Sequence, residues 1–286
     1  MNTNNILQVY KGDFFNSTHN NYSKKVLVFD LDETIGSFVE LNMLFDTLQY
    51  IYQDNNILSI ENLLSLYPEF FRNNIFQLLH YVYKKKNSGE CNKLYIYTNN
   101  QCKSQNVSSI IEYITKEVTN GKSTLFDQII YAFKINGFIV QVGRTSHKKT
   151  HDDLLRCTLL PKKTAICYLD DVYFDEMKTE RIYYLQPKPY FHGLSSYDIL
   201  HRLFSSKYSS LLDKYKDLIT DHYYTLCIKN NTFLKRNVRT DKLITENDEI
   251  TKKMMYHVRN FFFILRKKSK TMKKKIQRSS FTRKKQ

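Results

Sequence analysis

Two aspartates separated by a single residue, Asp30 and Asp32, directly follow an apolar run, and Thr34 comes two residues later. Carboxylates this close repel each other unless a cation or a shared proton lies between them. One carboxylate can attack phosphorus to form an acyl phosphate, while a neighbouring carboxyl protonates the leaving oxygen and later activates water. Residues 30–34 are therefore candidates for a metal-assisted reaction at phosphorus.

Three later segments supply the other groups that phosphoryl transfer requires. Thr98 ends an apolar run, and Lys148 and Lys149 precede a short helical segment. A lysine and a hydroxyl can hold phosphate oxygens while charge builds up in the transition state. Asp170 and Asp171 end another apolar run. Adjacent buried acids are costly without a cation, and carboxylate oxygens are ligands that Mg²⁺ prefers.

The choice between the two lysines stays open, with Lys149 preferred because the helical pattern begins at Thr150. The histidines at 147, 151 and 192 have no metal-ligand spacing with cysteine, so we assign them no role.

The elements that would position these residues follow from apolar periodicity. Residues 26–29 lack polar alternation, which predicts a strand buried on both faces, as in a parallel sheet. Ligands bind at the carboxyl ends of such strands, where Asp30 would lie. Further strands are expected within 94–100, 129–133, 138–142, 165–171 and 181–185. Helical spacing over 105–119 and after Thr150 separates them, and this alternation predicts an α/β fold with helices flanking a parallel sheet.

Composition divides the chain into four segments. We expect a polar, weakly ordered lead-in (1–23), a catalytic α/β domain (24–205), a helical C-terminal extension (206–265) and a basic tail (266–286). A helical insert over about 38–86 follows the first strand, and a polar connector is expected over 229–247.

The overall composition indicates a globular intracellular protein, cytoplasmic or nuclear. Hydrophobic residues make up 42% of the 286 residues and aromatic residues 14%, which excludes a disordered chain. The five cysteines form no C-x-x-C pair, which favours reduced thiols. We expect no signal peptide and no transmembrane helix, since no run of about 18 apolar residues occurs.

The positive charge is concentrated at one end of the chain. Residues 266–286 hold eleven Lys/Arg and no acid, so the remainder carries only +5 of the total +16. This basic tail could bind nucleic acid, a membrane surface or an import receptor, and the sequence leaves these open.

The order of the polar residues resembles the haloacid dehalogenase (HAD) superfamily of phosphatases. The resemblance covers roughly residues 25–200 and rests on Asp30-x-Asp32-x-Thr34 together with Thr98, Lys149 and Asp170-Asp171. It implies a HAD-like Rossmannoid sheet and Mg²⁺ as cofactor. It also implies that Asp30 is the nucleophile and a metal ligand.

The same resemblance implies roles for the remaining positions. Asp32 would be the general acid and base and would bind the metal through its backbone carbonyl. Thr98 and Lys149 would bind the phosphoryl group. Asp170 and Asp171 would complete the metal shell.

A narrower resemblance concerns Glu33, which precedes Thr34, and the segment 189–200. Both are similar to the FCP/SCP branch, the C-terminal-domain phosphatases of RNA polymerase II. That branch often has Asp-Asn where this chain has Asp170-Asp171, and it carries a short β insert where this chain has helical spacing. The resemblance implies a phosphoserine or phosphothreonine protein as substrate. Two alternatives remain: a phosphatase of nucleic-acid ends or nucleotides, and a catalytically inert module that binds nucleic acid through the basic tail.

Overall fold

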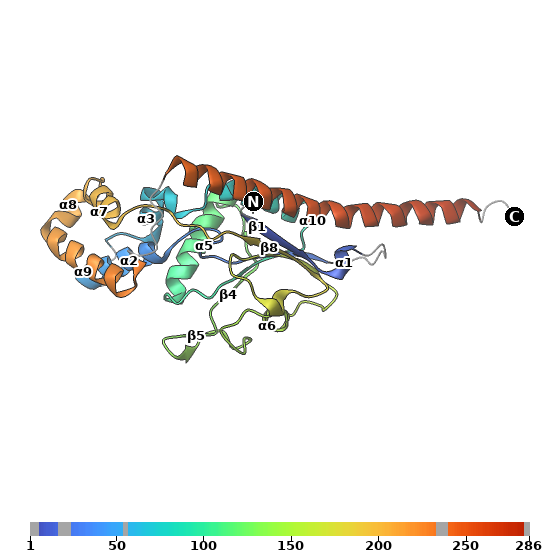
Figure 1. The fold of residues 1–286 in the computed structure, drawn as a ribbon, viewed down its shortest axis with the longest axis horizontal. Helices are drawn as coiled ribbons and strands as arrows, with labels where there is room; N and C mark the ends of the chain where they lie inside the picture. The colour runs from blue at the N-terminus through green and yellow to red at the C-terminus, as the bar shows by residue number, and fades with distance from the viewer. Residues whose placement is uncertain (1–5, 17–23, 54–56, 233–239, 283–286) are drawn as a thin grey trace, which may run out of the picture.

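Six strands form one twisted sheet in the order β1-β8-β7-β2-β3-β4 (Figure 1). The computed structural model describes residues 6–16, 24–53, 57–232 and 240–282, with side chains as far as residue 264. The strands are β1 (Leu7–Lys11), β2 (Lys25–Phe29), β3 (Lys93–Tyr97), β4 (Gln128–Ile130), β7 (Ala165–Leu169) and β8 (Ile182–Pro187). All neighbours pair in parallel except β1, which is antiparallel to β8. The predicted α/β fold with a mostly parallel sheet is confirmed.

Helices cover both faces of the sheet, which explains why its central strands lack polar alternation. Alternate strand residues such as Leu27 and Phe29 pack beneath α4 (Ile75–Asn87), α5 (Ser104–Thr119) and α10 (Asp241–Thr282). The intervening residues, such as Val28, face α6 (His151–Thr158) and η2 (Asp175–Met177). A strand covered on both faces must be apolar at every position.

A group of helices stands beside the strand ends that carry the polar residues. The expected helical insert comprises α2 (Val39–Ile51), α3 (Ile60–Leu66), η1 (Pro68–Phe70) and α4. The later helices are α7 (Ser196–Phe204), α8 (Ser209–Leu212), η3 (Asp213–Tyr215) and α9 (Lys216–Lys229). Helix α9 packs along α2, so part of the C-terminal extension lies beside part of the insert (Figure 1).

The polar lead-in expected over 1–23 is wrong for its middle part. Residues 7–11 form β1 at the edge of the sheet, and α1 (Asp13–Asn16) follows. Pairing with β8 satisfies the backbone of β1, and Phe14 and Phe15 are buried. Residues 1–5 and 17–23 lie outside the described part of the chain.

The strand expected at 138–142 does not join the main sheet. Residues Phe138–Ile139 (β6) pair with Lys134–Ile135 (β5) in a separate hairpin. The turn residues Asn136 and Gly137 have φ values of 50 and 84, as required for a two-residue hairpin turn. This local turn chemistry outweighs the apolar run.

Helix α10 begins within the expected connector (229–247) and continues into the basic tail. It begins at Asp241 and ends at Thr282, so the boundary expected at residue 266 lies inside one helix. Met254, Val258 and Phe261 are buried against the sheet, while the C-terminal part of α10 extends away from the body (Figure 1). Residues 233–239 and 283–286 lie outside the described part. No helix within the described residues is both long and apolar enough to cross a membrane.

The packing of α10 predicts that it stabilises the whole domain. The Phe261 ring lies 5.9 Å from that of Phe15 and 6.1 Å from that of Tyr183. We expect Phe261→Ala to lower the free energy of unfolding by about 3 kcal/mol because it leaves a cavity. Phe263→Ala removes the same side chain where it is 62% exposed and should cost far less. Urea denaturation of both variants checks this, and equal losses would contradict it.

Candidate functional site

A cleft of about 570 Å³ lies at the carboxyl ends of β7, β2 and β3, which are neighbours in the sheet. All six residues predicted from the sequence line this cleft: Asp30, Asp32, Thr98, Lys149, Asp170 and Asp171. Lys148, the alternative lysine, is instead exposed and pairs with Glu176 at 3.1 Å. The structure therefore brings together residues up to 141 positions apart in the chain.

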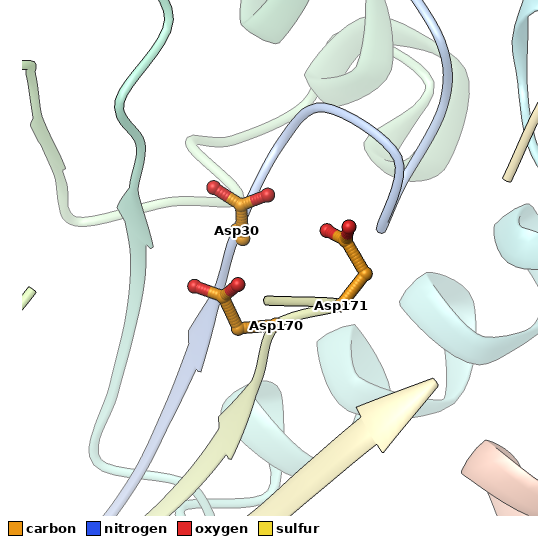
Figure 2. A group of neighbouring side chains, drawn as sticks. All are labelled: Asp30, Asp170 and Asp171. Atoms are coloured by element: carbon orange, nitrogen blue, oxygen red, sulfur yellow. The ribbon is translucent and has the colours of Figure 1, made fainter. Parts of the chain in front are cut away.

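Three carboxylates form the centre of the cleft. Figure 2 shows the side chains of Asp30, Asp170 and Asp171 grouped at the ends of β2 and β7. One carboxylate oxygen from each lies within 4.8 Å of the others, and all three residues are buried. The parallel pairing of β2 with β7 sets this distance, since Phe29 is in register with Leu169 and each is followed by an aspartate.

The Lys149 ammonium lies between two of these carboxylates. It donates to Asp30 Oδ1 and, at 2.6 Å, to Asp170 Oδ2. Its side chain is only 2% exposed. Burial alone would lower the pKa of Lys149, but Asp170 and Asp30 outweigh burial and raise it above its usual range. Lys149 precedes Thr150, whose hydroxyl caps α6 by accepting from Asp153 N–H, so the helix start fixes its place.

Thr34 and Tyr168, which have no predicted role, form hydrogen bonds with the adjacent acids Asp170 and Asp171. The Thr34 hydroxyl donates to Asp171 Oδ1 at 3.0 Å and accepts from the Asp171 N–H at 3.0 Å. The Tyr168 hydroxyl donates to Asp170 Oδ2, and Val172 N–H donates to Asp170 Oδ1 at 2.9 Å. The sequence shows Thr34 as part of the aspartate motif, but it does not show that Thr34 contacts Asp171.

Asn100 links the predicted acid/base to the predicted phosphate ligand. Its Nδ2 donates to Asp32 Oδ2 at 2.7 Å, and its N–H donates to Thr98 Oγ1 at 3.0 Å. Asp32 Oδ1 is buried without a hydrogen-bond partner among the described residues. Asn100 thus orients the Asp32 carboxyl through Oδ2. In the sequence, the position of Asn100 two residues after Thr98 was the feature that could have indicated its role.

A buried arginine, which sequence reasoning missed, holds the loop after the aspartates. Arg72 is 1% exposed and donates to the carbonyls of Thr34 at 2.7 Å, Glu33 at 2.5 Å and Lys188 at 2.9 Å. Glu33 has a φ of 55, in the left-handed region. Because all three acceptors are backbone carbonyls, no side chain in the sequence reveals this contact.

Burial raises the pKa values of three carboxyls in the cleft. Burial raises the pKa of Asp30 well above its usual range, against the opposing effect of Lys149. Burial also raises the pKa of Asp32 to about 6. For Asp171, burial followed by the charge of Asp170 raises the pKa to about 6. Each group therefore holds its proton to a higher pH than a free aspartate does.

The donor set suits a hard divalent cation. Three carboxylates face one ammonium, which leaves excess negative charge when they ionise. Such cations bind carboxylate oxygens. Asp30, Asp170 and Asp171 are the residues that would hold the ion.

Comparisons with protein-family models, curated proteins and solved structures found no match to this chain. The residues of the cleft and their geometry are therefore the grounds for a functional proposal.

The raised pKa values predict how stability depends on pH and metal. Between the usual aspartate pKa of 3.8 and about 6, the folded state binds more protons than the unfolded chain at Asp32 and Asp171. The contribution of these groups to stability therefore falls as pH rises through this window. Mg²⁺ competes with those protons, so we expect Mg²⁺ to raise the Tm more at pH 8 than at pH 5.

Thermal denaturation with and without Mg²⁺ at both pH values measures this effect. Asp170→Asn should abolish most of the Mg²⁺ response, whereas Asp152→Asn, at an exposed residue of α6, should retain it. An equal response in the two variants would contradict a metal site at this cluster.

Proposed function

We propose that this chain is a Mg²⁺-dependent phosphatase of the HAD type, which hydrolyses phosphomonoesters through an aspartyl-phosphate on Asp30. The observation that carries the proposal is the convergence of the six predicted residues on one cleft, with three carboxylate oxygens within 4.8 Å of one another. Its substrate class is phosphoserine or phosphothreonine protein. A bound Mg²⁺ would supply positive charge beside the phosphoryl oxygens, with the Asp32 backbone carbonyl as the further ligand that the resemblance implies.

The first step forms the acyl phosphate. A carboxylate oxygen of Asp30 attacks phosphorus, and the bond from phosphorus to the substrate oxygen breaks. The Asp32 carboxyl transfers its proton to that leaving oxygen, and its raised pKa of about 6 keeps part of the population protonated near neutral pH. Asn100 holds Asp32 in place through its bond to Oδ2.

The second step hydrolyses the intermediate. The Asp32 carboxylate accepts a proton from water, the water oxygen bonds to phosphorus, and the bond to Asp30 breaks. Lys149 and Thr98 hold phosphoryl oxygens in both steps. The Thr98 oxygen accepts from Asn100 N–H, so its own hydroxyl proton can be donated to the phosphoryl group.

The charge of the cleft favours a protein substrate over a nucleic-acid strand. Among the described residues that line it, the acids are Asp30, Asp32, Glu33, Asp46, Asp170 and Asp171, and the bases are Lys103 and Lys149. A strand with a phosphate at every nucleotide would be repelled by this excess of acids. A single phosphate on a peptide meets no such barrier once the metal is bound.

The nucleophile can be tested with a generic aryl phosphate. Asp30→Asn removes the attacking carboxylate, and we expect turnover to fall by at least about 10³-fold while the circular dichroism spectrum is kept. Asp152→Asn is the matched control and should hydrolyse the substrate like the wild type. Undiminished turnover by the Asp30 variant would overturn the mechanism.

The substrate class needs a separate panel. Phosphoserine and phosphothreonine peptides should be hydrolysed, and oligonucleotides with 3′- or 5′-phosphates should not. Preferential hydrolysis of the oligonucleotides would replace the protein substrate by a nucleic-acid end.

A further inference from the structure

Four exposed apolar residues form a patch on the β5–β6 hairpin and directly after it: Phe138, Ile139, Val140 and Val142. In this hairpin patch, Phe138 is 78% exposed and Val142 is 87% exposed. Residues 135–142 include no charged residue, and the hairpin stands out from the body of the molecule (Figure 1). A group of neighbouring exposed apolar side chains is typical of a surface that binds another molecule.

The hairpin lies at the edge of the cleft that holds the predicted catalytic residues. Asn136, in the turn of the hairpin, lines this cleft. Phe138 is two residues further along the chain, so its Cα lies within about 7 Å of that of Asn136. A polypeptide that presents a phosphorylated residue to the cleft therefore passes close to the hairpin patch.

Arg144 connects the base of the hairpin to the cleft. It is buried and donates to the carbonyl of Tyr131, which precedes the hairpin, at 3.0 Å. It also donates to the carbonyl of Thr98 at 3.1 Å. The Tyr131 N–H in turn donates to Gln141 Oε1 at 3.2 Å. The hairpin patch is thus held in a defined position relative to Thr98, so that a ligand does not have to order it first.

The cleft itself has exposed apolar residues beside its acidic centre. Val39, the first residue of α2, and Val172, which follows β7, are exposed and line the cleft. They belong to elements other than the hairpin, so apolar surface is available around the cleft from more than one element. The aspartates at the centre suit a metal ion and a phosphate, whereas these valines and the hairpin patch suit apolar groups on either side of the phosphate.

We propose that the hairpin patch binds an apolar side chain of the substrate polypeptide, close in sequence to the phosphorylated residue. This inference rests on the proposed phosphatase function and narrows its substrate to phosphoserine or phosphothreonine flanked by a residue such as leucine. Contact with the patch removes apolar surface of both partners from water and thereby adds affinity that does not depend on the phosphate. The patch touches no reacting atom, so it acts on polypeptide substrates and not on small phosphate esters.

A peptide panel tests the proposal. Phosphoserine peptides carry leucine, or asparagine of similar shape, at each position within about three residues of the phosphoserine. For at least one position we expect the kcat/KM of the wild type to be about tenfold higher with leucine, the scale that burial of a few apolar groups supplies. Successive strand residues face opposite sides of a hairpin, so Phe138→Ser and Ile139→Ser are tested separately. At least one of them should abolish most of the leucine preference, and both should hydrolyse an aryl phosphate like the wild type.

Phe263→Ser is the matched control, because it makes the same change at an exposed residue of α10. It should keep the leucine preference. Equal kcat/KM for leucine and asparagine at every position, or a preference that survives both hairpin variants, would overturn the proposal. Sedimentation of the same proteins tests another occupant of the patch. A wild-type dimer that dissociates in Phe138→Ser, with the peptide preference unchanged, would assign the patch to a second copy of the chain.

A binding measurement separates failure of this inference from failure of the catalytic proposal. Calorimetry with the Asp30→Asn variant measures the Kd of the same peptides without turnover and should also favour leucine by about tenfold. If the wild type hydrolyses no phosphomonoester, but this binding preference is present and is lost on adding a hairpin substitution, the catalytic proposal fails and the docking surface stands. If the aryl phosphate is hydrolysed but no peptide shows the preference, the docking surface alone fails.

Discussion

The ion pairs of Lys149 with Asp30 and Asp170 are the contacts on which the rest of the site depends. Three buried ionisable groups from β2, β7 and the start of α6 meet there, and each would be unfavourable alone in a buried environment. Removing one partner of a buried pair typically costs about 3–5 kcal/mol. The sheet register and the α6 cap must therefore place these groups together, and any ligand of the cleft has to interact with a cluster that is already organised.

Buried polar groups of the loop after the aspartates also need partners, and here the partner is an arginine. Arg72 donates to two of its carbonyls, those of Glu33 and Thr34, and to the carbonyl of Lys188 after β8, while lying against the Tyr190 ring. Gly36 completes the loop, since a Cβ there would lie 2.5 Å from the Phe70 carbonyl oxygen. The helical insert thus does more than flank the cleft, because Arg72 and Phe70 come from it and fix the backbone on which Asp32 depends.

The sequence was most informative where one strand ends in one polar residue. Asp30, Thr98 and Asp170 could be placed because the ends of parallel strands converge, whatever the loops do. Arg72 and Asn100 could not, since their contacts depend on the path of the backbone between elements. Tyr168 could not because every residue of β7 is buried, and burial alone does not distinguish it from its neighbours. Strand β1 was missed because an edge strand is only partly buried, and its short pattern resembles a polar loop. The β5–β6 hairpin was missed because a two-residue turn decided the pairing.

Helix α10 has a mechanical consequence. Its first half belongs to the hydrophobic core through Val258 and Phe261, and the same helix continues to Thr282. At about 1.5 Å per residue, the 21 residues from Phe262 to Thr282 span roughly 30 Å. The basic residues up to Thr282 thus lie on a continuous helix that is anchored in the core, and not on a flexible linker. A molecule bound by this part of the helix would be held at a defined distance and direction from the cleft.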